Sequence, residues 1–122
     1  MKYKKYIKDS INISEIGLGA WQLGQNSGWK SMTEIEAVKL VHKSLDFGIN
    51  FFDTAPNYGH GTGEIRLGKA LHNQDRSKIV INTKFGHRHT GSLNFHSDYI
   101  RESLEGSLKR LQVDYVDSLI FH

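Results

Sequence analysis

Four side chains that can do acid–base chemistry follow short apolar runs in this sequence. They are a carboxylate, a phenol, an ammonium and an imidazole: Asp53, Tyr58, Lys84 and His122. Taken alone, a lysine or an aspartate at a strand end is most often a loop charge. Four such groups in register with successive strands instead indicate one site, because parallel strands end at the same edge of a sheet.

The apolar runs themselves predict strands that are buried on both faces. They cover residues 16–21, 49–53, 79–84 and 116–122. Nearly continuous apolar runs of this length are typical of parallel sheets, whose two faces are both covered. Their spacing is close to the roughly 31 residues per strand–helix unit of a (β/α)8 TIM barrel. The sequence therefore predicts an α/β fold, the N-terminal half of such a barrel, with residues 1–122 in a single domain.

Amphipathic segments between these runs predict three helices. The first opens with Ser31 and Glu34 in the spacing of a capping box and stops at Gly48. The second covers about residues 63–71. Gly63 stands where a serine would cap this second helix better, so we expect a weakened N-cap.

The third predicted helix begins at an N-cap at Ser97 or Asp98. Gly106 lies inside it and costs about 1 kcal/mol relative to alanine, so we expect this glycine to pack closely on the sheet. The residues expected to face inward are Ile100, Leu104, Leu108 and Leu111.

Charge and composition exclude several classes of function. Four of the 16 basic residues lie in the first eight positions, and the 12 that remain are balanced by 13 acidic residues, so a nucleic-acid partner is not expected. Segments 3–7 and 11–13 predict a short hairpin there. The chain has no cysteine, no secretory leader and no apolar run of the roughly 18 residues that a membrane span needs. We therefore expect a cytoplasmic protein with no membrane partner.

Three histidines and several glycines are weaker indications of a ligand-binding site. The histidines are interpreted as residues of a solvated loop, because no carboxylate or cysteine recurs beside them at ligand spacing, and no metal is expected. Gly24 and the glycines before it lack the spacing of a dinucleotide fingerprint. Segment 86–95 is predicted to be a mobile active-site loop. The histidines are His87, His89 and His96.

The strongest motif is DTAPNYG at residues 53–59, followed by Gly63-Glu64 and by LGKAL at residues 67–71. It resembles the pattern D-T-A-x-x-Y-G, then S/G-E, then L-G-x-A-L, of the aldo-keto reductase family. The resemblance extends from about residue 14 to the end. The other segments that carry it are 16–21, 83–84 and 107–122.

When the family's roles are carried over by position, the resemblance implies that Tyr58 donates a proton and that Asp53 and Lys84 activate Tyr58. It also implies that His122 orients the substrate carbonyl. An oxygen that gains negative charge on hydride transfer needs a proton, and a free tyrosine, with a pKa of about 10, is a weak donor at neutral pH. A nearby ammonium stabilises the phenolate, and a histidine can donate a hydrogen bond to the same oxygen. Because His122 also carries the terminal carboxylate, we expect its imidazole to stay protonated.

The same resemblance implies reduction of aldehydes or ketones to alcohols with a nicotinamide cofactor. NADPH is favoured, NADH is not excluded, and the implied contacts are Ala20, Trp21 and Asp53. Trp21 could equally be a packing residue at the barrel rim. Ala20 replaces the usual threonine, so a backbone contact would survive there and a hydroxyl contact would not.

Half a barrel leaves two strand edges and an apolar face uncovered. We therefore expect a truncated product, a fragment, or a chain that associates through its open edges, for example as a homodimer. The alternative function is a non-catalytic interaction or oligomerisation module, a use of this fold found in potassium-channel β subunits. The complete set of four polar residues favours the catalytic interpretation.

Overall fold

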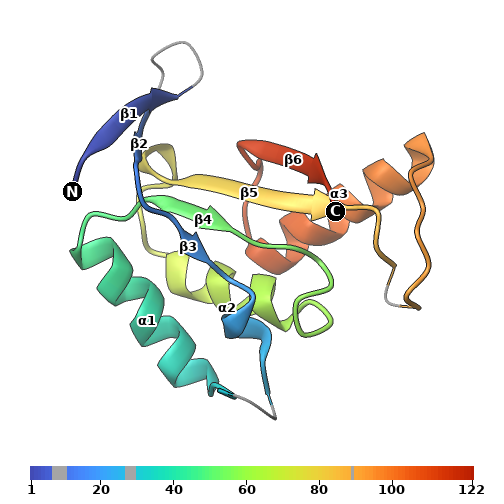
Figure 1. The fold of residues 1–122 in the computed structure, drawn as a ribbon, viewed down its shortest axis with the longest axis horizontal. Coiled ribbons are helices and arrows are strands. Elements are labelled where there is room, and N and C mark those ends of the chain that lie inside the picture. Colours follow the sequence, from blue (N-terminus) through green and yellow to red (C-terminus); the bar gives the residue numbers. More distant parts are fainter. Residues whose placement is uncertain (7–10, 27–29, 89) are drawn as a thin grey trace.

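The computed structural model describes residues 1–6, 11–26, 30–88 and 90–122. Its centre is a four-stranded sheet in the order β3-β4-β5-β6, and each neighbouring pair is parallel. The order of the strands in space is their order in the chain, as in successive units of a barrel (Figure 1). The predicted parallel α/β sheet is thus confirmed. The strands are β3 (Leu18–Gly19), β4 (Phe51–Asp53), β5 (Val80–Phe85) and β6 (Ser118–Phe121).

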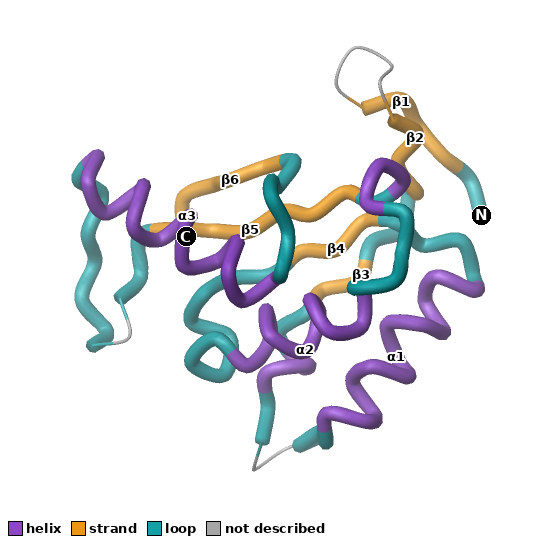
Figure 2. Tube along the Cα trace, turned by 180° about the vertical axis from the view of Figure 1, so that it is seen from behind, coloured by secondary structure: helices purple, strands orange, loops and turns teal. Residues whose placement is uncertain are grey.

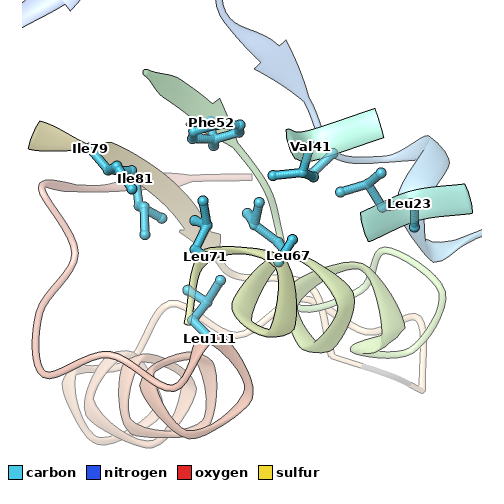
Figure 3. Close-up of a cluster of buried hydrophobic side chains, with 11 residues drawn as sticks. Leu23, Val41, Phe52, Leu67, Leu71, Ile79, Ile81 and Leu111 are labelled. Atoms are coloured by element: carbon cyan, nitrogen blue, oxygen red, sulfur yellow. The ribbon is translucent and has the colours of Figure 1, made fainter. Parts of the chain in front are cut away.

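Helices follow β3, β4 and β5 and cover one face of this sheet (Figures 1 and 2). They are α1 (Glu34–Asp46), α2 (Thr62–Leu71) and α3 (Ser97–Leu111), with short 3-10 turns η1 (Gln22–Gly24) and η2 (Arg76–Lys78). Alternate strand residues such as Phe52 and Ile81 pack on Val41, Leu67 and Leu111 of the helices (Figure 3). None of the helices within the described ranges is long and apolar enough to cross a bilayer.

The start of α1 differs from the prediction. Its capping box is formed by Thr33 and Glu36, two residues later than the predicted pair with the same spacing. The cause is Met32, whose N–H donates to the carbonyl of Gln25 at 2.9 Å and whose carbonyl accepts from Arg66 at 2.8 Å. These tertiary hydrogen bonds keep the backbone before Thr33 out of the helix. The predicted end is confirmed, since Gly48 has a φ of +82° directly after the helix.

Helix α3 also corrects the prediction. It starts at Ser97 with His96 as N-cap, and its buried face is formed by Ser103 and Ser107 together with Leu111, while the other predicted inward residues are only half-buried. Small side chains face inward because α2 approaches closely there: a Cβ at Gly68 would lie 2.5 Å from the carbonyl oxygen of Leu111. Gly106 does not pack on the sheet. The nearest atoms to a Cβ there belong to the Arg110 guanidinium.

A hairpin of β1 (Tyr3–Tyr6) and β2 (Ile11–Ser14) precedes the sheet, as predicted, with Tyr3 opposite Ser14. The predicted turn and the strand end at position 7 lie outside the described residues. Asn50, just before β4, ties the hairpin to the sheet. Its side chain accepts from the N–H of Ser14 at 2.8 Å and donates to the carbonyls of Asn12 and Lys78. The hairpin is thereby fixed at the N-terminal ends of the strands, away from the predicted site.

A buried carboxylate joins three elements behind the sheet. Glu64 of α2 is fully buried, and its two oxygens accept from the hydroxyl of Thr83 in β5 and from Nε of Arg110 in α3, both at 2.7 Å. Burying a charge is unfavourable unless it is paired and hydrogen-bonded. Here both oxygens have partners, so the network fixes β5 against the helices.

Removing one partner of Glu64 should therefore cost much more than removing an exposed ion pair. We expect Arg110→Met to lower the free energy of unfolding by about 3 kcal/mol, because it leaves the buried carboxylate without its cation. The matched control is Lys69→Met, which breaks the exposed pair with Glu34 and should cost less than about 1 kcal/mol. Urea unfolding of both variants checks this, and equal losses would contradict the role given to Glu64.

Candidate active site

The ammonium of Lys84 is the centre of the polar cluster at the C-terminal edge of the sheet. It donates to Oδ2 of Asp53 at 2.7 Å, to the carbonyl of Thr54 at 3.0 Å and to the hydroxyl of Tyr58 at 3.3 Å. An ammonium has three N–H donors, and each has an acceptor here. With 11% of its side chain exposed, Lys84 is held in one position. Three of the four predicted side chains are thus in direct contact.

Asp53 is the last residue of β4 and is oriented by its neighbour in the sheet. Asn82 of β5 is its register partner, and the Asn82 amide donates to Oδ1 of Asp53 while Lys84 occupies Oδ2. Sequence reasoning missed Asn82. The available signal was a polar amide inside an otherwise apolar strand run, where the buried position demands a partner.

Tyr58 lies in the loop between β4 and α2, and this loop depends on two glycines. Gly59 has a φ of +59°, and a Cβ there would overlap the carbonyl oxygen of Gly24 in η1. A Cβ at Gly24 would in turn lie 2.6 Å from the carbonyl oxygen of Tyr58. The loops after β3 and β4 therefore touch backbone to backbone, which explains Gly24 without a dinucleotide fingerprint.

Gly63 has a role other than the predicted weak N-cap. The N-cap of α2 is Gly61, and Gly63 is buried within the first turn. Its N–H donates to the carbonyl of Tyr58 at 3.0 Å, and a Cβ there would lie 3.1 Å from the Cβ of Tyr58. Glycine thus leaves room for the tyrosine loop.

His122 joins the cluster from the residue after β6. Its N–H donates to the carbonyl of Phe85 at 2.9 Å, and its ring lies edge-on to Tyr58 with centroids 5.8 Å apart. Burial lowers the pKa of His122, and the positive charges of His87 and Lys84 lower it further, whereas Asp53 acts in the opposite direction. The expectation of a protonated imidazole is therefore wrong. A neutral ring retains one N–H that can donate a hydrogen bond.

Ala20 and Trp21 lie at the same edge, directly after β3. Ala20 is fully buried, and its N–H donates to the carbonyl of Asp53 at 2.8 Å, so its link to the cluster runs through the backbone. The side chain of Trp21 is 48% exposed, which leaves much of its indole free to meet a ligand.

The interpretation of His87 as a residue of a solvated loop is corrected by the structure, in which this residue is half-buried. The structure places its ring against His122, with centroids 4.8 Å apart. Its loop, predicted as segment 86–95, is tied by the N–H of Asn94 to the carbonyl of Gly86 at 2.8 Å and by a bridge from His87 to Leu93. Whether the loop is mobile stays a prediction.

Comparison with known proteins agrees with this fold. The sequence model of the Aldo/keto reductase family matches residues 15–122. The chain belongs to this family. It is 40% identical over 114 residues to L-galactose dehydrogenase of Arabidopsis thaliana, an alignment that covers 92% of this chain and 35% of the relative.

Solved aldo-keto reductases have the same fold over this stretch. The PA4992 aldo-keto reductase of Pseudomonas aeruginosa matches with a TM-score of 0.85 and 32% identity, over 98% of this chain and 47% of that one. An aldo-keto reductase of Klebsiella pneumoniae in complex with NADPH matches with a TM-score of 0.73 and 26% identity, over 91% and 36%. The chain thus spans about a third to a half of the length of these proteins, and its fold is part of a (β/α)8 barrel.

The contact between the two glycine loops can be tested by substitution. Gly59→Ala adds a methyl group to a residue with positive φ and also forces it into Gly24, so we expect it to lower the free energy of unfolding by about 3 kcal/mol. Gly91→Ala is the matched control, since Gly91 has a φ of +84° but, its chain neighbours aside, no atom of the described residues lies within 4 Å of the place that a Cβ would take. It should cost only about 1 kcal/mol. Urea unfolding measures both losses, and similar values in the two variants would show that the loops do not meet as described.

Proposed function

We propose that the protein containing these residues reduces aldehydes or ketones to alcohols with a nicotinamide cofactor, and that Tyr58 donates the proton. The observation that carries this proposal is the set of three acceptors around Lys84. Because the Tyr58 oxygen accepts a hydrogen bond from Lys84, the proton of its own hydroxyl is free to point to another acceptor. A substrate carbonyl oxygen is such an acceptor.

In this mechanism the chain supplies the proton and stabilises the charge that its loss leaves behind. Tyr58 gives its hydroxyl proton to the carbonyl oxygen as that oxygen becomes negative, and the Lys84 ammonium stabilises the phenolate that remains. Asp53 keeps the ammonium in place. The neutral imidazole of His122 donates its N–H to the same carbonyl oxygen, which polarises and orients it. Positioned acid catalysis of this kind typically contributes about 10² to 10⁴ in rate.

Two residues at this edge are proposed to meet the cofactor: Trp21 through its indole and Asp53 through its carboxylate. The contact expected at Ala20 is not proposed, because Ala20 is fully buried and its N–H donates to the carbonyl of Asp53. These residues fit such a group, since Trp21 is 48% exposed and 37% of the Asp53 side chain is exposed. The cofactor supplies the hydride when it is bound. NADPH is preferred, as in the Klebsiella structure that contains it, and NADH stays an alternative.

Activity is proposed to require the remaining strands of the barrel. The chain covers only 35% to 47% of the relatives described above, and β3 and β6 are the edges of the sheet. Ile120 and Phe121 of β6 are 42% and 71% exposed, as expected for a strand that lacks a neighbour. Association through these open edges, including a homodimer, is one way to complete the sheet.

A chimera tests the proposed acid directly. Residues 1–122 are joined to the C-terminal part of the Pseudomonas relative, whose similarity allows its strands to continue from β6. We expect this chimera to oxidise NADPH only when an aldehyde such as 4-nitrobenzaldehyde is added. Tyr58→Phe keeps the ring but removes the transferable proton, so kcat should fall by about 10² to 10⁴.

Cofactor binding, followed by protein fluorescence, is the control and should be unchanged in Tyr58→Phe. Full turnover in that variant would eliminate Tyr58 as the proton donor. A chimera that folds and binds NADPH but reduces no carbonyl would instead favour the non-catalytic alternative.

A further inference from the structure

Among the described residues, the imidazole of His122 has two aromatic neighbours, and one of them has no role in the proposed reaction. The His87 and His122 centroids lie 4.8 Å apart, with the ring planes at 71°. Tyr58 and His122 form a second edge-to-face pair, with centroids 5.8 Å apart and planes at 88°. Such pairs prefer a defined angle between the rings. His122 is therefore oriented from two segments, the loop after β4 and the loop after β5.

The backbone of His87 is fixed by the fold. Gly86, just after β5, has a φ of +121°, which glycine adopts without strain and which turns the chain directly after the strand. His87 then pairs with Leu93 in an antiparallel bridge, and its carbonyl accepts from the hydroxyl of Tyr99 in α3 at 3.3 Å. The ring is thus brought to His122 by the turn at Gly86 and by the contacts that the His87 backbone makes with Leu93 and Tyr99.

Among the described residues, the titratable groups that face His122 are two basic and two acidic ones. They are Lys84 of β5 and His87, and Asp53 of β4 and Tyr58 of the next loop. A proton on His122 would meet the positive charge of Lys84, which the pair with Asp53 only partly offsets, and the positive charge of His87 when that ring is protonated. The lowered pKa of His122 agrees with this arrangement, with burial as its largest cause and His87 as the next.

We propose that His87 is a positioning residue for His122: its imidazole holds the His122 ring edge-on and disfavours its protonation. This proposal rests on the proposed function, in which His122 orients the substrate carbonyl. A cationic imidazole is a stronger acid than a phenol and would compete with Tyr58 as the proton donor. By keeping His122 neutral, His87 leaves proton donation to Tyr58 and hydrogen bonding to His122.

Titration of the histidine ring signals by NMR tests the proposal on the chain itself. In the unsubstituted chain the midpoint of His122 should lie below that of an ordinary histidine. His87→Phe keeps an aromatic ring against His122 but removes the titratable charge, so it should move the midpoint of His122 upward. The ring contact between His122 and Tyr58, followed as a nuclear Overhauser effect, should persist.

The matched control is His72→Phe. His72 is exposed at the C-terminal end of α2, which runs back toward the N-terminal ends of the strands. This substitution removes one imidazole at the end of the sheet opposite to the site. It should leave the titration midpoint of His122 unchanged.

An unchanged His122 midpoint in His87→Phe would overturn the proposal. If that variant does not fold, the unsubstituted chain decides. There the midpoint of His122 should lie below that of an ordinary histidine, and a midpoint at or above the ordinary value would overturn the proposal. These measurements need no turnover, so their outcome is separate from that of the Tyr58→Phe assay.

Discussion

The three hydrogen bonds of the Lys84 ammonium are the interaction on which the site depends. They join the end of β5 to three places: the Asp53 carboxylate at the end of β4, the backbone carbonyl of Thr54, and the Tyr58 hydroxyl in the loop before α2. Because all three N–H groups are used, the lysine cannot move without breaking a contact to one of these segments. The proposed proton donor and the charge that stabilises its anion are therefore set in place together.

The rest of the fold keeps this ammonium in position. On the helix-covered side, the next residue back along β5, Thr83, bonds to the buried carboxylate of Glu64, so the strand that carries Lys84 is fixed from behind. On the other side, the Asn82 amide holds the second oxygen of Asp53. The paired glycines Gly24 and Gly59 set the path of the tyrosine loop. The Thr83–Glu64 hydrogen bond and the Gly24–Gly59 contact touch no reacting atom. Each of them nevertheless positions a residue of the site, Lys84 in the first case and Tyr58 in the second.

Local patterns in the sequence predicted the parallel sheet and the four strand-end residues, because hydrophobic period and strand spacing are properties of short segments. Features that depend on contacts between distant segments were not predicted. Thr33 is the N-cap of α1 because Arg66 holds the residue before it, and α2 approaches α3 closely where Gly68 meets Leu111. His87 reaches the site only through the turn at Gly86, whose angle the spacing of histidines does not reveal.

The most direct measurement is a double-mutant cycle on kcat/KM in the chimeric reductase, with Lys84→Met, Tyr58→Phe and both substitutions together. If Lys84 acts through the Tyr58 hydroxyl, as the 3.3 Å contact between them implies, each single substitution lowers kcat/KM by about 10² to 10⁴ and the double variant is little worse than Tyr58→Phe alone. Losses that multiply would contradict this account, because they would mean that the two residues act independently on the reaction.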